Sequence, residues 1–130
     1  MKGSIISTSI TPWLSVNKAA AAVDFYKTAF NASETYRLAA PDGGLVVRLS
    51  VVGAEFWVCG ESTQKGSAAQ PLGGDSIRII LTVANPDLIF DQALKAGASE
   101  VFPVGEGHGW RLGRLMDPFG LHWEIGHPLE

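Results

Sequence analysis

The sequence predicts an α+β fold built from two tandem βαβββ modules. The order of strand-like and helix-like segments repeats along the 130 residues. Matched residues recur at one spacing, since Val16 precedes Val83 by 67 positions and Gly53 precedes Gly120 by the same number. A stretch rich in Ser, Gly, Gln and Pro, residues 61–74, separates the two copies and is expected to connect them.

The first module is expected over about residues 8–60. Apolar and polar residues alternate over 10–16, as in a strand with two different faces. Asn17 is expected to cap an Ala-rich helix over 18–30, which Asn31 ends in a left-handed conformation. Further strands are expected over 34–39, 45–52 and 55–59.

The second module is expected over about residues 75–127. It opens with an alternating strand over 76–83 that places Ile77 on the apolar side. Asn85-Pro86 is expected to start a helix that ends before Gly97. The repeat slips by one residue here, because the Ala-Ser-Glu of 32–34 recurs at 98–100, 66 positions later. The remaining strands are expected over 99–104, 110–116 and 121–125.

The composition predicts one globular domain over residues 1–130. Hydrophobic residues make up 46% and charged residues 18% of the chain. The net charge of −3 argues against a nucleic-acid partner, which normally selects a basic face. Cys59 is the only cysteine, so no disulfide forms within the chain. The sequence shows no membrane span and no convincing signal peptide, and we expect a cytoplasmic protein.

Two motifs resemble the vicinal oxygen chelate superfamily, of the glyoxalase/bleomycin-resistance/dioxygenase type. The helix carries Ala22, Phe25-Tyr26 and Phe30, and the end of the chain carries Asp117-Pro118-Phe119-Gly120 followed by Trp123-Glu124. Within the superfamily the PhnB-like branch is the most similar, and the resemblance covers nearly the whole chain. It implies cup-shaped mixed sheets with the helices on the outer face, in a homodimer.

The resemblance also assigns the family's four metal-ligand positions to Thr11, Trp57, Arg78 and Glu124. Of these residues only Glu124 is a type that coordinates divalent metals, whereas a catalytic metal needs about three protein ligands. We therefore predict no metal and no other cofactor. An ion pair between Arg78 and Glu124 is the simplest replacement.

Strand alternation from these positions assigns further side chains to the cavity. Trp13 and Trp57 lie on the cavity side of module 1 together with Arg48, and the repeat assigns Arg111 to the same side of module 2. Indoles mixed with charged groups suit a flat or amphipathic ligand. The alternative is that both tryptophans pack in the core or at a dimer interface.

The sequence leaves three functions open. The first is a metal-independent protein that binds an aromatic drug or metabolite, as the resemblance to bleomycin-resistance proteins implies. The second is a lyase, isomerase or transferase of the same superfamily that uses Glu124 and His122 for proton transfer, or a divalent metal. The third is a homodimeric interaction module without chemistry. The expected partners are a small molecule and a second copy of the chain.

Overall fold

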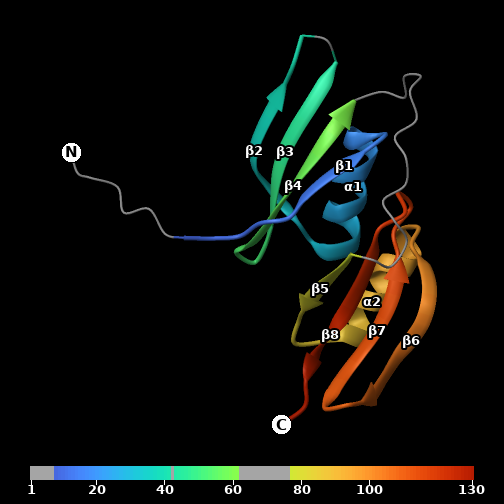
Figure 1. Ribbon diagram of the computed structural model, residues 1–130. Coiled ribbons are helices and arrows are strands. Elements are labelled where there is room, and N and C mark those ends of the chain that lie inside the picture. The colour runs from blue at the N-terminus through green and yellow to red at the C-terminus, as the bar shows by residue number, and fades with distance from the viewer. Residues whose placement is uncertain (1–7, 42, 62–76) are drawn as a thin grey trace.

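The computed structural model describes residues 8–41, 43–61 and 77–130, which form two helices and eight strands (Figure 1). The predicted connector and Ser76 lie outside these residues, except that Glu61 ends a strand. Neither helix is long and apolar enough to cross a membrane in the part of the chain that the structure describes.

Module 1 forms one mixed sheet with the order β1-β4-β3-β2. Strand β1 runs parallel to β4, and the other neighbours are antiparallel. A parallel pair requires a crossover, which the helix and the two following strands supply. The elements are β1 (Trp13–Val16), α1 (Ala19–Phe30), β2 (Ser33–Ala39), β3 (Gly44–Val51) and β4 (Ala54–Glu61).

Module 2 repeats this topology with the order β5-β8-β7-β6, and β5 is parallel to β8. The predicted α+β fold of two βαβββ modules is therefore confirmed. In Figure 1 the blue-to-green sheet and the yellow-to-red sheet are separate, each with its own helix. The elements are β5 (Arg78–Thr82), α2 (Pro86–Ala96), β6 (Ser99–Gly107), β7 (Trp110–Met116) and β8 (His122–Pro128).

The helix ends agree with the sequence in three of four cases. Asn31 ends α1 with φ 61° and ψ 33°, the predicted left-handed conformation. The backbone N–H of Leu88 donates to the Asn85 side chain at the start of α2, and Gly97 ends that helix with a positive φ. The predicted cap by Asn17 is wrong, because Lys18 precedes the first helical residue and caps it with no side-chain hydrogen bond.

The first strand of each module is shorter than its alternating pattern. Strand β1 begins at Trp13 rather than at position 10, and β5 begins at Arg78. Ile77 was expected in the core but is 66% exposed, because it precedes the paired part of β5. The alternating pattern of apolar residues in the sequence thus extends beyond the residues that pair with a neighbouring strand.

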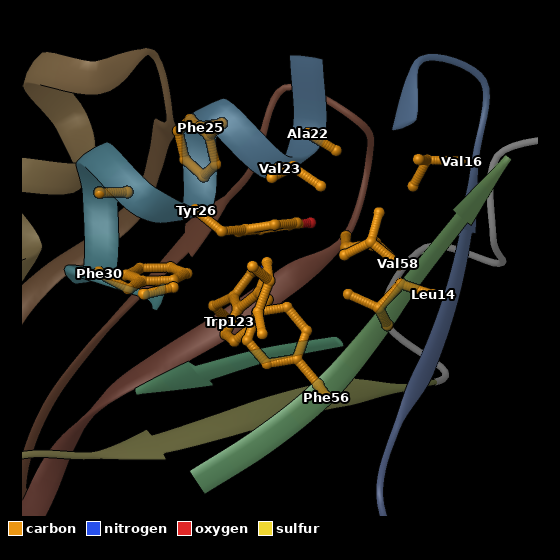
Figure 2. Packing of buried hydrophobic residues seen from close by; sticks show 14 of the residues in the cluster. Leu14, Val16, Ala22, Val23, Phe25, Tyr26, Phe30, Phe56, Val58 and Trp123 are labelled. Carbon is orange, nitrogen blue, oxygen red and sulfur yellow. The ribbon is translucent and has the colours of Figure 1, made fainter. Parts of the chain in front are cut away.

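The two modules share one hydrophobic core on the sides of the sheets that face the helices. Trp123 of β8 packs against Phe30 of α1 and Phe56 of β4, with ring centroids 4.7 and 5.5 Å apart. Figure 2 shows this contact, with Tyr26 and Val58 beside it. A side chain of module 2 therefore completes the core of module 1, so neither half buries its apolar surface alone.

Asp117 joins the two modules at the centre of this core. It follows β7 and is 1% exposed. One carboxylate oxygen, Oδ2, accepts from the Tyr26 hydroxyl at 2.5 Å and from Trp123 Nε1 at 2.9 Å. The other, Oδ1, accepts from the backbone N–H groups of Phe119 and Leu121. The acidic residue of the 117–120 turn thus fixes its own turn, the last strand and a helix 91 residues away.

Tyr26 keeps its proton in this arrangement. Burial first, and then the negative charge of Asp117, raise the pKa of the Tyr26 hydroxyl well above its usual value. The hydroxyl therefore remains a donor to the carboxylate throughout the physiological range of pH.

We expect Asp117→Asn to lower the free energy of unfolding by about 2–4 kcal/mol, measured by urea denaturation. The variant amide keeps one acceptor oxygen for the turn but turns an NH₂ group toward the buried donors of Tyr26 and Trp123. The control is Asp91→Asn, since exposed Asp91 pairs with Lys95 one helical turn away and we expect a change of about 0.5 kcal/mol or less. Equal effects of the two substitutions would contradict this role of Asp117.

Candidate functional site

Each sheet has a face turned away from its helix, which we call the open face. On the open face of module 1, the indoles of Trp13 and Trp57 stack with centroids 5.7 Å apart and planes 27° apart. Tyr36 of β2 meets Trp57 edge-on at 5.7 Å. The guanidinium carbon of Arg48 lies 5.3 Å from the Trp57 ring centroid, in cation–π contact. We call Trp13, Tyr36, Arg48 and Trp57 the aromatic platform.

Strand pairing builds the platform directly. Trp13 is opposite Trp57 in the parallel β1–β4 pair, and Arg48 is opposite Trp57 in the antiparallel β3–β4 pair. The Arg48 side chain is held by Thr35, whose hydroxyl accepts from its Nε at 2.8 Å, and by Glu55, whose carboxylate lies 3.6 Å from the same nitrogen. The platform therefore presents flat aromatic surface with a positioned cation at its edge.

The open face of module 2 carries the predicted ion pair. Arg78 Nε lies 3.5 Å from Glu124 Oε2, and the Glu124 side chain is only 14% exposed. Beside it, Arg114 Nε donates to His122 Nδ1 at 3.1 Å. Because arginine cannot accept a hydrogen bond, this contact requires a neutral His122 that carries its proton on Nε2. His122 and Glu124 thus share a face, because they are two residues apart on β8.

A cavity of about 460 Å³ is lined by residues of both modules, with Trp13 and Leu14 from module 1 and Arg78 and Leu121 from module 2. The structure therefore brings the predicted residues Trp13, Trp57 and Arg48 together on the platform. It also pairs Arg78 with Glu124 on the other sheet. Trp13 and Arg78 line the same cavity.

A larger cavity of about 530 Å³ lies farther along the open face of module 2. Its volume lies within the usual range for small-molecule sites. Glu124 belongs to its lining, as do apolar residues of β5, β6 and β7.

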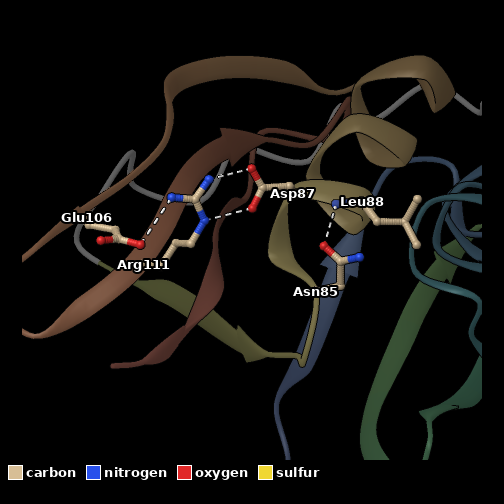
Figure 3. A network of polar contacts seen from close by, with 5 residues as sticks. All are labelled: Asn85, Asp87, Leu88, Glu106 and Arg111. Atoms are coloured by element: carbon tan, nitrogen blue, oxygen red, sulfur yellow. Dashed lines mark hydrogen bonds and ion pairs between the residues drawn. The ribbon is translucent and has the colours of Figure 1, made fainter. Parts of the chain in front are cut away.

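The predicted place of Arg111 in the cavity is wrong. Arg111 lies on the face of β7 that packs against α2, as does Gly113, where a Cβ atom would meet Phe90. Its Nε and Nη2 atoms donate to the two oxygens of Asp87 at the start of α2, at 2.8 and 2.6 Å (Figure 3). These hydrogen bonds hold the pKa of Asp87 below its usual value. Glu106 lies 3.4 Å from Nη1 on the other side.

The difference arises from the one-residue slip in the repeat. A spacing of 67 places Arg111 on the open face of β7, whereas the spacing of 66 that begins at Ala98 persists through this strand. Arg48 is opposite Trp57, and the residue in the matching place of module 2 is Arg114, which is opposite Glu124. Arg114 follows Arg48 by 66 positions, so the slip was the signal that could have found it.

Thr11 is half-buried and lies in the segment before β1, where the paired strand has not begun. The four positions that the family resemblance assigns to a metal, those of Thr11, Trp57, Arg78 and Glu124, do not fit a divalent cation. Only Glu124 offers a suitable ligand, and Arg78 brings a positive charge to within 3.5 Å of it. The described residues contain no group of three His, Cys, Asp or Glu side chains that could hold a metal.

The class of fold follows from comparison with solved structures. A glyoxalase/bleomycin-resistance/dioxygenase domain from Frankia sp. EAN1pec superposes with a TM-score of 0.73 at 15% identity, covering 95% of this chain and 99% of that one. The fold is therefore that of the glyoxalase/bleomycin-resistance/dioxygenase proteins. No protein-family model matches the sequence.

Two proteins with higher sequence identity show the family to which the chain belongs. An uncharacterised protein of Mycobacterium bovis is 37% identical over an alignment of 132 positions, which covers 96% of this chain and 86% of the relative. The X-ray structure of a gene product from Arabidopsis thaliana shares 30% identity with a TM-score of 0.66, covering 94% of this chain and 98% of that one. The chain belongs to the same family as the mycobacterial protein.

Proposed function

We propose that this protein binds a flat aromatic small molecule on the open face of module 1, without a metal. The observation that carries the proposal is the aromatic platform. Trp13 is 52% exposed although it stacks on Trp57, so one indole is held in place while much of its surface faces outward. A flat ligand extends this stack, and Arg48 binds an acidic or polar substituent at its edge.

Binding without chemical change suits the residues at the metal positions, since a Trp and an Arg replace potential ligands there. Among the proteins of this fold we take the bleomycin-resistance type as the model for function, with protection from an aromatic drug as one biological outcome. On its motifs we assign the chain to the PhnB-like branch. We place it in the cytoplasm, where the half-exposed thiol of Cys59 remains reduced.

The binding test compares 1-naphthoate with its saturated decahydro form, which has the same charge and a similar size. We expect Trp57→Leu to weaken 1-naphthoate binding by about tenfold or more, measured by NMR titration, because it removes the centre of the stack. Trp110→Leu is the matched control, since it alters a tryptophan on the other sheet, and we expect no change.

Three results would contradict the proposal. They are equal weakening by the two substitutions, equal binding of the aromatic and saturated acids, and no response across a broad panel of aromatic compounds. Chemical conversion of a bound compound, detected by mass spectrometry and lost in Glu124→Gln, would instead favour an enzyme that uses Glu124 and His122.

We further propose that a second copy of the chain covers the open faces. Both faces carry large apolar side chains with substantial exposure, including Trp13 at 52%, Ile80 at 59% and Phe102 at 39%. Soluble monomers rarely expose so much clustered apolar surface. Strands β2 and β6 also lie at sheet edges, where unpaired backbone groups favour association.

Sedimentation velocity tests this association. We expect a particle of twice the 13.8 kDa of one chain at micromolar concentration, because pairing two chains buries apolar surface from both faces. A particle of 13.8 kDa at all concentrations up to the millimolar range would contradict the dimer.

A further inference from the structure

The larger cavity on module 2 has a chemistry unlike that of the aromatic platform. It encloses about 530 Å³ between the open face of the second sheet and the hairpin that joins β6 to β7. Its walls are mainly apolar and come from three strands, with the side chains of Ile80, Phe102, Trp110 and Leu112. None of its residues belongs to the platform.

The carboxylate that faces this cavity is that of Glu124, which lies on β8 with a side chain that is only 14% exposed. Glu106, near the end of β6, also belongs to the lining, but its carboxylate lies 3.4 Å from Arg111 on the helix-facing side of the sheet. The third titratable residue of the lining is His108, in the turn between β6 and β7. Trp110 and Phe102 add aromatic rings, whose faces attract cations.

We propose that this cavity is a binding site for an apolar molecule that carries a protonated amine. The apolar walls take the body of such a molecule, and the amine donates to the carboxylate of Glu124 with the ring of Trp110 beside it. The ligand class follows from the charge of the lining, because an anion of the same shape would meet the carboxylate of Glu124.

The arginine beside the Glu124 carboxylate leaves room for the amine. Arg78 Nε is 3.5 Å from Glu124 Oε2, which is not a short ion pair. Arg78 does not line the cavity, and Arg114, which donates to His122, does not line it either. A carboxylate accepts several hydrogen bonds through its two oxygens, so Glu124 binds Arg78 and an ammonium group together.

Three probes of one shape test the proposal, namely 3-phenylpropylamine, 3-phenylpropanol and 3-phenylpropanoate. Near neutral pH they carry a positive charge, no charge and a negative charge. We expect the amine to bind the wild-type protein about tenfold or more tighter than the alcohol, measured by NMR titration, and the acid to bind weakest.

Two variants separate the charge of Glu124 from the shape of the cavity. We expect Glu124→Gln to bring the dissociation constants of the amine and the alcohol together while binding of the alcohol persists, which also shows that the variant is folded. Glu55→Gln, on the open face of module 1, is expected to leave the preference for the amine unchanged. Trp57→Leu is expected to leave it unchanged too, so failure of the platform proposal and failure of this one are distinguishable.

Several outcomes would overturn the proposal. Equal binding of the amine and the alcohol to the wild-type protein would do so, as would tighter binding of the acid. A preference for the amine that survives Glu124→Gln, or that disappears in Glu55→Gln, would place the cation elsewhere.

Discussion

The hydrogen bonds to Asp117 are the interaction on which the rest of the structure depends. A single buried carboxylate accepts from the Tyr26 hydroxyl, the Trp123 indole and two backbone N–H groups. A buried charge is tolerated only when it is satisfied in this way. Because its partners come from both modules, the repeat units are fixed relative to each other on their helix sides.

This constraint determines which faces of the sheets can bind a ligand. The helix-facing sides of both sheets are buried in the shared core, in which Trp123 completes the packing around Phe30 and Phe56. Of the two faces of each sheet, it is the open face that remains for a ligand or for a second chain. On the open faces the modules differ, since one presents stacked indoles with Arg48 and the other an apolar cavity with Glu124. The repeated topology thus offers two different surfaces.

The sequence predicted the order of the elements and the two-module fold, because alternation and the repeat depend on local spacing. The Arg78–Glu124 ion pair was predicted instead from the metal positions that the family resemblance implies. The sequence failed at Arg111, where a one-residue slip reverses the face on which a side chain lies. It did not predict the role of Asp117 in joining the modules, since a hydrogen bond to Tyr26 across 91 positions leaves no local pattern. The contacts within the aromatic platform could not be predicted, because they depend on how β1, β3 and β4 pair to bring Trp13, Arg48 and Trp57 together.

The central claim is that ligands bind the open faces while the Asp117 joint remains unchanged, and the four tryptophans report on both. The most direct measurement is a ¹H–¹⁵N spectrum of the indole N–H signals, recorded as 1-naphthoate and 3-phenylpropylamine are added separately. The account predicts that the acid moves the signals of Trp13 and Trp57, that the amine moves that of Trp110, and that Trp123 stays in place with both. Movement of Trp123 as large as the others, or no movement of Trp13 and Trp57, would contradict it.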